Sequence, residues 1–467
     1  MALRVFRTPK IWRPRHRSIR LRAKERAAPR SIGVTGVVLG FAALVLVGTI
    51  LLSLPMARVP SQPLSLLSSL FTATSAVCLV GLLVVDTGTY WTTFGQIVIL
   101  GLIQLGGIGI MTTTMLILVI LRRSVSLQDR VELYELSKAG GLRSVTGLIW
   151  LTVLITAGAE LLGMLALWFR LRQTYGDEGG WWPAAFYSVS AFNNAGFDLS
   201  KNFSSLTPFS RDPALLVVVS FLIIAGGISV LVLIDLTAKR SWRLLTPNSK
   251  MLLAASGFLL AIGFGGVLLF EFNNPNTLGN LPIADKATNS FFQSATARTA
   301  GFNSISISGM NDATLFLTMA LMYIGGATGS TAGGIKVSTF AVLVLAAWAS
   351  IHGYQHASAF GRRFSHRLVY RALTVAVLSG GVIFLGTLML TLTEEFAFRR
   401  LLFEVVSAFG TVGLTTGITP DLSVAGKVTI IVIMFIGRLG PLSLAYALAQ
   451  RARQRRYALP EKDVAIG

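Results

Sequence analysis

Four short segments of the chain share a pattern with which backbone oxygens can hold a cation. They read FTATSAVCLVGL, FYSVSAFNNAGF, FFQSATARTAGF and FEVVSAFGTVGL, and in each a glycine follows a phenylalanine by ten positions. The phenylalanines are Phe71, Phe186, Phe291 and Phe403, and the glycines are Gly81, Gly196, Gly301 and Gly413. Because glycine readily adopts positive φ, each glycine lets consecutive carbonyl oxygens turn toward one axis. Four such turns could replace the hydration shell of a dehydrated monovalent cation.

The residues between each phenylalanine and its glycine predict a short helix that enters a membrane and returns. A helix of roughly ten residues is about 15 Å long, which is half the thickness of the hydrocarbon core. Non-helical backbone at that depth is tolerated only where protein or water surrounds it, since an unpaired amide in lipid costs several kcal/mol. The carbonyl ends of the short helices also favour a cation. We therefore expect four re-entrant pore loops that line an aqueous path.

Apolar runs of helix length flank each of these loops. The pattern recurs about every 110 residues, so it defines an architecture and not only a local structure. The sequence predicts repeats at 31–121, 145–236, 251–349 and 369–448, with a broken second helix in the third, a basic arm at 1–30 and a tail at 449–467. The expected fold is an all-α membrane protein of four helix–pore-loop–helix repeats, with eight transmembrane helices and four pore helices around one pseudo-fourfold ion pathway.

The composition independently indicates an integral membrane protein. Hydrophobic residues make up 53% of the 467 residues, charged residues make up 13%, and the mean hydropathy is +0.67. An average soluble domain carries about 25% charged residues. Cys78 is the single cysteine, which excludes an intramolecular disulfide and a multi-cysteine metal site.

The net charge of +21 gathers in basic flanks of apolar runs and does not predict a nucleic-acid partner. Residues 1–30 hold eleven Arg or Lys and one acid, Glu25, directly before the first apolar run. Basic flanks stay in the cytoplasm and contact membrane lipids. Both termini are therefore expected there, in a multi-pass protein of the cell membrane. The opposite linkers carry acids that form either a cation-attracting vestibule or ordinary solvated loops: Asp177, Glu178, Asp285, Glu394 and Glu395.

The four loops, with TATSAVCLVGL first and TARTAGF third, resemble the Trk/Ktr/HKT superfamily of potassium transporters over about residues 31–450. With no extra pair of spans before the first repeat, the chain is most similar to the shorter Ktr-type membrane subunit. The resemblance implies potassium as the transported ion, held at the four glycines, and no covalently bound cofactor; sodium as a coupling or activating ion stays open. It also implies a homodimer and a soluble ring of nucleotide-binding regulatory subunits on the cytoplasmic face.

The resemblance assigns a selectivity filter to the last four residues of each loop. They are Cys78, Leu79, Val80 and Gly81; Asn193, Asn194, Ala195 and Gly196; Arg298, Thr299, Ala300 and Gly301; and Gly410, Thr411, Val412 and Gly413. The first loop departs from the family pattern at Cys78-Leu79-Val80, where hydroxyl residues are commoner, so the strictness of potassium over sodium stays open. Arg298 brings a cation near the filter and is expected to bond loop carbonyls.

The second apolar run of the third repeat contains ten consecutive residues without a bulky side chain. Their helix propensity is poor, so the helix must break there. The resemblance marks this segment as an intramembrane gating loop that Lys336 ends. The predicted gate residues are Gly325, Gly326, Ala327, Thr328, Gly329, Ser330, Thr331, Ala332, Gly333, Gly334, Lys336 and Arg438. The string GSTAGGIK lacks the spacing and the preceding strand of a phosphate-binding loop.

Arg438 enters this set by its place in the repeat. The slot that holds Gly107, Gly227 and Gly326 in the first three repeats holds Arg438 in the fourth. The guanidinium either bonds carbonyls of the broken third helix or stands in the ion path. The double glycines Gly106–Gly107 and Gly226–Gly227 are also common helix-packing devices in membranes.

Two further candidates are weaker. Glu160 lies inside an apolar run, where an ionised side chain is costly, so it marks either a functional site or a structural partner that the sequence does not name. His352 and His356 have the i, i+4 spacing of a helical metal site, but Gly353 and the lack of a helix-borne acid argue against one. A polytopic membrane enzyme or sensor is the alternative function, although no nucleophile–base or metal set stands at membrane depth.

Overall fold

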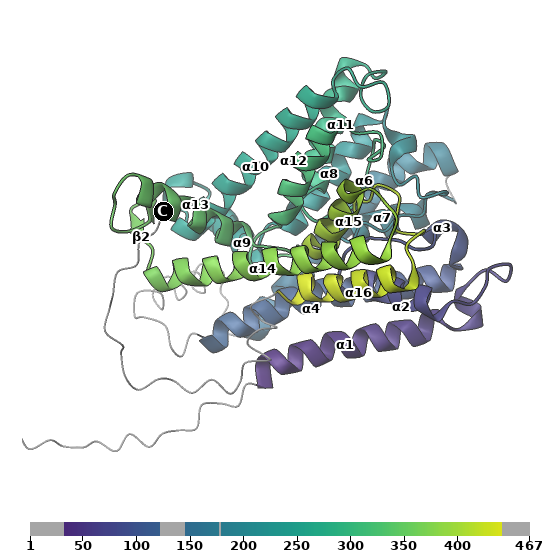
Figure 1. Ribbon diagram of the computed structural model, residues 1–467, viewed down its shortest axis with the longest axis horizontal. Coiled ribbons are helices and arrows are strands. Elements are labelled where there is room, and N and C mark those ends of the chain that lie inside the picture. Colours follow the sequence, from purple (N-terminus) through teal and green to yellow (C-terminus); the bar gives the residue numbers. More distant parts are fainter. Residues whose placement is uncertain (1–31, 122–144, 177–178, 441–467) are drawn as a thin grey trace, which may run out of the picture.

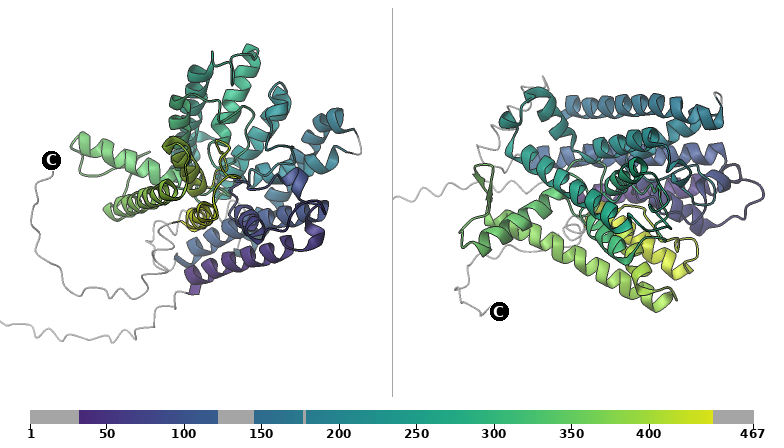
Figure 2. Two further views of the ribbon diagram at one scale, coloured as in Figure 1. Left: turned by 45° about the vertical axis from the view of Figure 1, so that its right-hand side comes forward. Right: turned by 90° about the horizontal axis from the view of Figure 1, so that it is seen from above.

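The computed structural model describes residues 32–121, 145–176 and 179–440, which form a bundle of helices (Figures 1 and 2). The described residues contain one sheet, a hairpin of β1 (Ser358–Ala359) and β2 (Arg362–Arg363). The predicted arm at 1–30, the tail at 449–467 and the acids Asp177 and Glu178 lie outside the described residues. The prediction of an all-α membrane protein is confirmed.

The helices follow the predicted order of repeats. The long helices are α1 (Ile32–Leu52), α4 (Thr93–Leu121), α6 (Val145–Tyr175), α10 (Pro247–Glu271), α14 (His366–Thr393) and α16 (Val424–Leu439). The short helices at the loop positions are α2 (Leu66–Val77), α7 (Trp181–Phe192), α11 (Ile283–Thr296) and α15 (Phe398–Gly410). The second helix is divided in two repeats, into α8 (Pro213–Gly227) and α9 (Val230–Lys239), and into α12 (Asp312–Tyr323) and α13 (Val337–Ile351). Single turns are α3 (Thr87–Tyr90), η1 (Pro55–Ala57), η3 (Thr207–Phe209) and η4 (Trp242–Leu244).

Capping residues fix where several helices begin. The hydroxyl of Thr246 accepts a hydrogen bond from Ser249 N, and Pro247 takes the first position of α10. The carboxylate of Asp212 accepts a hydrogen bond from Leu215 N, and Pro213 takes the first position of α8. Such side chains satisfy amides that have no partner in the first helical turn, and proline loses nothing there. These local signals place the helix starts next to the loops.

Three described helices are long and apolar enough to cross a membrane by themselves, at 149–175, 247–271 and 366–393. α8 and α9 together are long and apolar enough to form a fourth span, if the bent pair is taken as one span. α12 and α13 are each too short to cross alone, because a break separates the two halves of this helix. The total of eight spans therefore remains a prediction.

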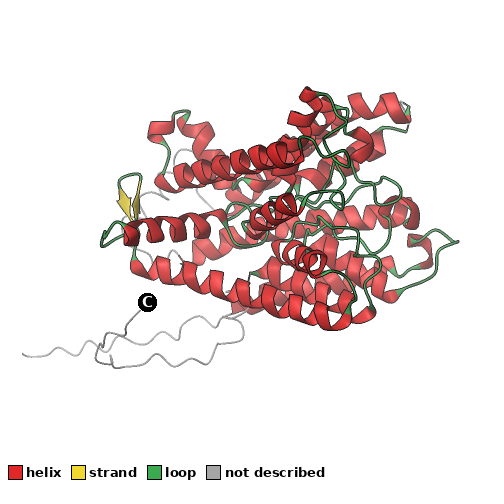
Figure 3. Ribbon diagram, turned by 45° about the horizontal axis from the view of Figure 1, so that its top comes forward, coloured by secondary structure: helices red, strands yellow, loops and turns green. Residues whose placement is uncertain are grey.

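The short helices at the loop positions lie within the bundle. All the residues of α2 from Phe71 to Val77 are buried, and so are most residues of α7, α11 and α15. Each packs against the long helix before it in the chain. Figure 3 shows the loop segments that follow these helices crossing the middle of the bundle. The bundle thus surrounds the four non-helical segments with protein, as the predicted re-entrant loops require.

The second repeat differs from the sequence prediction of one continuous helix. α8 ends at Gly227, and α9 continues at an angle of 98°. The sequence could not reveal this break, since the pair Gly226–Gly227 fits helix packing as well as a turn. The break exposes the carbonyl oxygens of Gly226 and Gly227, and these oxygens accept hydrogen bonds from the third repeat.

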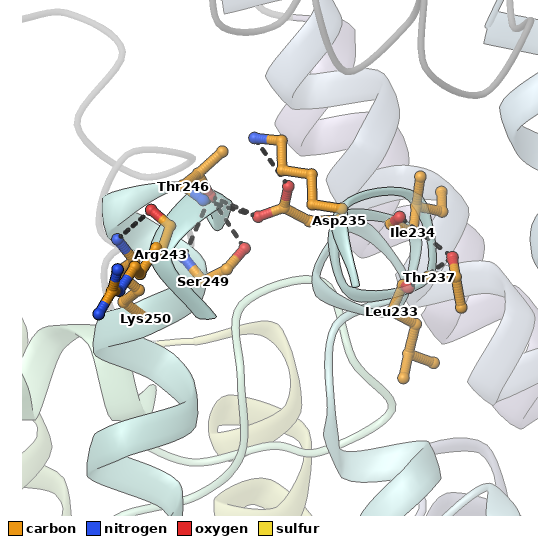
Figure 4. Close-up of polar contacts among 9 residues, drawn as sticks. Leu233, Ile234, Asp235, Thr237, Arg243, Thr246, Ser249 and Lys250 are labelled. Carbon is orange, nitrogen blue, oxygen red and sulfur yellow. Dashed lines mark hydrogen bonds and ion pairs between the residues drawn. The ribbon is translucent and has the colours of Figure 1, made fainter. Parts of the chain in front are cut away.

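A buried carboxylate holds α9 in its turned position (Figure 4). Asp235 on α9 is 1% exposed, and its Oδ2 accepts hydrogen bonds from Thr246 N at 2.9 Å and Thr246 Oγ1 at 3.0 Å. Its Oδ1 forms an ion pair with Lys239 at 3.1 Å. Because Thr246 caps α10, this one side chain joins α9 to the beginning of α10.

Candidate ion pathway

The four loop glycines share one unusual backbone conformation. The φ angles of Gly81, Gly196, Gly301 and Gly413 are +87°, +71°, +83° and +93°. Two positions earlier stand Leu79, Asn194, Thr299 and Thr411, with φ angles of +53°, +53°, +78° and +51°. A left-handed residue is strained when it carries a side chain, so four repeats of the same strain point to a shared function. The alternation turns successive carbonyls toward one side of each loop.

The glycines also meet one another in cyclic order. A Cβ atom on Gly81 would lie 2.6 Å from the carbonyl oxygen of Ala195, and one on Gly196 would lie 2.7 Å from that of Ala300. A Cβ on Gly301 would lie 2.4 Å from the Val412 oxygen, and one on Gly413 would lie 2.1 Å from the Val80 oxygen, which closes the ring. Each loop therefore packs backbone to backbone on the next. We call this arrangement the glycine ring.

Hydroxyl groups of the short helices hold the glycine ring in place. Ser75 Oγ accepts a hydrogen bond from Gly81 N at 3.0 Å, and Ser407 Oγ accepts one from Gly413 N at 3.1 Å. In the other two repeats the hydroxyl donates instead, from Ser190 to the Phe197 oxygen and from Thr296 to the Phe302 oxygen, each at 2.7 Å. The sequence analysis missed these residues. Their signal was a serine six positions before the glycine in three of the four segments.

The first residue of each predicted filter quartet lies at the end of a short helix. These residues are Cys78, Asn193, Arg298 and Gly410. Arg298 donates hydrogen bonds to the oxygen and the Oγ of Ser256 on α10, at 3.3 and 3.1 Å. These hydrogen bonds reach α10 and not the loop carbonyls that we expected, because Ser256 of α10 lies within reach of the guanidinium.

Asn193 supplies the partner of Glu160 that the sequence could not name. Its Nδ2 donates to Glu160 Oε1 at 2.8 Å and to Gln104 Oε1 at 2.9 Å, while Gln104 Nε2 donates to Glu160 Oε2 at 3.0 Å. Three helices, α4, α6 and α7, contribute one residue each. The cluster joins the first and second repeats beside the glycine ring and gives Glu160 a structural role.

The predicted break in the third repeat is present between Tyr323 and Val337. We call its residues 325–336 the gate loop. Ala327 N donates to the Gly227 oxygen at 3.1 Å, and Thr331 donates to the Gly226 oxygen through N at 3.4 Å and Oγ1 at 3.0 Å. The gate loop thereby satisfies the carbonyls that the α8–α9 break exposes. The two broken helices stabilise each other.

The gate loop also lies directly against the residues below the glycine ring. A Cβ on Gly333 would lie 2.0 Å from Thr411 Oγ1, and one on Gly325 would lie 3.4 Å from the methyl carbon of Thr299. Between repeats, Asn194 Nδ2 is 3.4 Å from Thr299 Oγ1. Only glycine allows so close an approach at Gly333.

Two cationic side chains donate hydrogen bonds to carbonyls of the gate loop: Arg438 from the fourth repeat, and Lys336, the last residue of the loop itself. Arg438 is 4% exposed, and it donates to the Thr331 oxygen and, at 3.3 Å, to the Gly106 oxygen of α4. Lys336 Nζ donates to the Ala332 oxygen at 2.6 Å. Arg438 thus joins carbonyls of the first and third repeats, which confirms the carbonyl-bonding hypothesis.

The double glycines pack against the ends of the short helices. A Cβ on Gly106 would lie 2.2 Å from the Val77 oxygen, and one on Gly226 would lie 1.7 Å from the Phe192 oxygen. A Cβ on Gly437 would likewise lie 2.1 Å from the Phe409 oxygen. The packing interpretation is therefore right for these positions.

Of the five acids predicted in the linkers, Glu394 has a side-chain contact, because its Oε2 accepts a hydrogen bond from Ser423 N at 3.1 Å. Two further acids are also bonded to protein. Asp312 pairs with Arg399, and Asp198, just after the second loop, accepts from Ser200 N at 2.9 Å and is 5% exposed. Burial raises the pKa of Asp198 to about 7, and the Asp86 carboxylate acts in the same direction. The cation-attracting vestibule stays a prediction beside that of ordinary solvated loops.

The two histidines at i, i+4 do not form the helical metal site. α13 ends at Ile351, so His356 lies beyond the helix. The His352 ring stacks on Trp348 with centroids 4.2 Å apart, and His356 Nδ1 is 3.2 Å from His366 Nε2. No group of three metal-ligating side chains occurs among the residues that the structure describes.

The chain is similar to known proteins in sequence and in fold. The family model TrkH, cation transport protein, matches residues 22–457. Ktr system potassium uptake protein B of Bacillus subtilis is 42% identical over 92% of this chain and 95% of its own, and potassium/sodium uptake protein NtpJ of Enterococcus hirae is 37% identical over 95% and 99%. The solved structure of the potassium transporter TrkH from Vibrio parahaemolyticus has a TM-score of 0.73 at 19% identity, over 92% of this chain and 86% of its own.

The fold and the glycine ring together define a multi-pass membrane transport protein. The chain belongs to the TrkH family of cation transport proteins, as a membrane subunit of the Trk/Ktr type. It is a transporter and not an enzyme, so the alternative of a polytopic membrane enzyme is wrong.

Proposed function

We propose that this chain takes up potassium across the cell membrane and that the ion passes through the glycine ring. The single observation that carries the proposal is the closed contact of four positive-φ glycines from four repeats. Backbone carbonyls arranged around one axis replace the hydration shell of a monovalent cation. The names of the relatives, potassium uptake protein B and potassium/sodium uptake protein, support potassium and leave sodium as a coupling or activating ion open.

The proposed filter consists of the last three residues of each loop. They are Leu79, Val80 and Gly81; Asn194, Ala195 and Gly196; Thr299, Ala300 and Gly301; and Thr411, Val412 and Gly413. The carbonyl oxygens of these residues supply the ligands, and the four glycines form the potassium site. The remaining members of the predicted quartets position the loops, as Asn193 does through Glu160 and Arg298 through Ser256.

We propose that the gate loop, Lys336 and Arg438 form one barrier below this filter. The support is the set of contacts at one level, where the gate loop bonds Gly226 and Gly227 and Arg438 bonds Thr331 and Gly106. All four repeats contribute to that level. Opening requires the gate loop to leave the axis, which breaks some of these bonds.

The repeats 31–121, 145–236, 251–349 and 369–448 are proposed to surround one pseudo-fourfold pathway with both termini in the cytoplasm. The basic residues Arg240 and Arg243 between α9 and α10, and Lys250 in the first turn of α10, support this orientation. A homodimer and a cytoplasmic ring of nucleotide-binding regulatory subunits complete the proposal, which rests on the family alone for both.

The test is ion flux into liposomes that contain the purified chain. A potassium gradient should drive uptake of labelled rubidium, with and without a regulatory subunit, and excess potassium should compete more strongly than excess sodium. Liposomes with a chain carrying Gly196→Leu, which fills the ring, serve as the control and should give no uptake. Flux absent from the wild-type chain in both conditions would refute the proposal.

A further inference from the structure

A cavity of about 190 Å³ lies between the second and third repeats, next to the gate loop. The end of α8, the first half of α10, the end of α11 and the gate loop form its walls. Among the residues that line it are Ile224, Ile228, Leu253, Gly257, Arg298 and Gly326. Neither the filter glycines nor Arg438 line it, whereas Gly227 and Gly326 of the gate level do, so the cavity borders the proposed barrier from the side of α10.

The lining of the cavity suits hydrocarbon. Apart from Ser256 and Arg298, its lining residues are aliphatic or glycine. The two terminal nitrogens of Arg298 donate to Ser256, and Arg298 Nε is the buried nitrogen of this side chain that has no hydrogen-bond partner. A dry cavity of about 150 Å³ with aliphatic and aromatic walls holds a benzene molecule, so this volume is sufficient for several methylene groups. Water needs two to four polar partners and finds few here.

The position of the cavity indicates where the hydrocarbon comes from. α10 begins at Pro247, and at 1.5 Å per residue the lining residues from Leu253 to Leu260 lie about 9 to 20 Å along it. That depth is the region of acyl chains in one leaflet. Gly257 and Phe258 on α10 are exposed, as is Phe221 on α8, so the rim of the cavity faces lipid.

We propose that this cavity binds an acyl chain of a phospholipid from the leaflet near the start of α10, and that the bound chain keeps the gate loop closed. The binding stands independently of potassium transport, whereas the effect on the gate rests on the proposed function. The chain would contact Gly326 on the gate loop and Ile228 at the α8–α9 break, where the two broken helices join through the bond of Ala327 to Gly227.

The packing of Gly326 explains why the chain would act on the gate loop. A Cβ on Gly326 would lie 2.5 Å from the Ala332 side chain and 3.0 Å from the Gly227 oxygen, so the protein sides are filled. The Gly326 oxygen accepts from Val337 N at 3.0 Å. The cavity is the remaining space toward α10, and a chain inside it blocks displacement of the gate loop in that direction.

The test fills the cavity and measures the chain directly. Gly257→Phe adds an aromatic ring at a lining position where a Cβ meets no atom within 4 Å. Gly265→Phe is the matched control, because Gly265 is also on α10, is also open, and does not line the cavity. Each protein is placed in nanodiscs of phospholipid with brominated acyl chains, and bromine scattering is located by electron cryo-microscopy.

Bromine density is expected in the cavity of the wild-type and Gly265→Phe proteins and not in the Gly257→Phe protein. Leu253→Trp, which enlarges a second lining residue, should also remove it. Absence of the density from the wild-type protein, or its persistence in both filled variants, would overturn the binding site. This readout does not depend on ion flux.

Rubidium flux in liposomes then tests the effect on the gate loop. A permanent aromatic ring replaces the chain, so Gly257→Phe should lower flux at least threefold relative to Gly265→Phe. Equal flux in the two variants, with density changed as expected, would contradict control of the gate loop while leaving the binding site in place.

Discussion

The glycine ring and the gate level below it come from the same four repeats but differ in symmetry. In the ring, every repeat contributes a positive-φ glycine and the same contact to the next loop. At the gate level, the corresponding positions hold an unbroken helix at Gly107, a bent helix at Gly227, a loop at Gly326 and a guanidinium at Arg438. Equivalent ligands suit ion selection, whereas a barrier that opens needs one element that moves against fixed neighbours.

The largest effect is expected from breaking the symmetry of the ring. In Gly81→Ser the added Cβ would stand 2.6 Å from the Ala195 oxygen at a φ of +87°. The loop must shift, so we expect the preference for potassium over sodium to fall tenfold or more. The measurement is competition of potassium and sodium with rubidium uptake.

Gly417→Ser is the control for backbone strain alone, since Gly417 has a φ of +88° but no atom within 4 Å of its Cβ position. It should keep the wild-type preference. If the preference for potassium over sodium is the same in the wild type and in Gly81→Ser, the first-loop glycine is not part of the filter.

The next effect concerns the gate level and the asymmetric position in it. Arg438→Ala should raise basal flux and weaken control by a regulatory partner. A guanidinium about 6 Å from a cation at an effective dielectric constant of about 20 repels it by about 2.8 kcal/mol, on the order of a hundredfold in occupancy. Removing the bonds to Thr331 and Gly106 also loosens the gate loop.

Arg400→Ala is the matched variant, since Arg400 likewise bonds a loop carbonyl, that of Thr416 at 2.8 Å, but near the opposite end of the fourth repeat. Its basal flux should stay at the wild-type value. If Arg438→Ala gives folded protein with unchanged or lower flux, Arg438 is a scaffold residue and the barrier lies elsewhere.

A smaller effect is expected where α9 is tied to α10. Asp235→Ala removes both hydrogen bonds to Thr246 and the pair with Lys239. α9 then moves more freely, which loosens the turn that follows the end of α8, where the gate loop bonds the carbonyls of Gly226 and Gly227. We expect a two- to fivefold rise in basal rubidium flux.

Thr237→Ala provides the comparison, because the Thr237 hydroxyl bonds only carbonyls of α9 itself (Figure 4). It should not change the flux. A rise of the same size in both variants would show that α9 responds to any change and that Asp235 has no special part.

The smallest effect is a pH dependence beside the glycine ring. Burial raises the pKa of Asp198 to about 7 in the folded protein, against about 4 in the unfolded chain. The folded state keeps the proton over this range, so the free energy of unfolding falls as pH rises from about 4 to about 7. Asp198→Asn should weaken this dependence in thermal unfolding at pH 5 and pH 8. The exposed Asp421→Asn variant should retain it, and a wild-type slope in Asp198→Asn would contradict the burial argument.

The repeating parts of the molecule could be predicted from the sequence, and the unique contacts could not. The glycines, the short helices and the broken third repeat all follow from local composition. The starts of the short helices were less visible, since α2 begins at Leu66 and α11 at Ile283, before the shared phenylalanines. The part of each helix that precedes the phenylalanine carries no common pattern.

The α8–α9 break and the partner of Glu160 depend on residues far apart in the chain. Gly226 and Gly227 bend away because Ala327 and Thr331, a hundred positions later, satisfy their carbonyls. Glu160 is satisfied by Gln104 and Asn193 from two other helices. Pairings of this kind leave no periodicity in the sequence, so only the three-dimensional arrangement reveals them.

The most direct test of the glycine ring is to locate the ion. Crystals of the wild-type protein grown with rubidium should show an anomalous peak encircled by Gly81, Gly196, Gly301 and Gly413, and the peak should be lost or weakened in Gly81→Ser. A protein that transports rubidium in liposomes but shows its ordered rubidium elsewhere, with none at the glycine ring, would contradict the central claim.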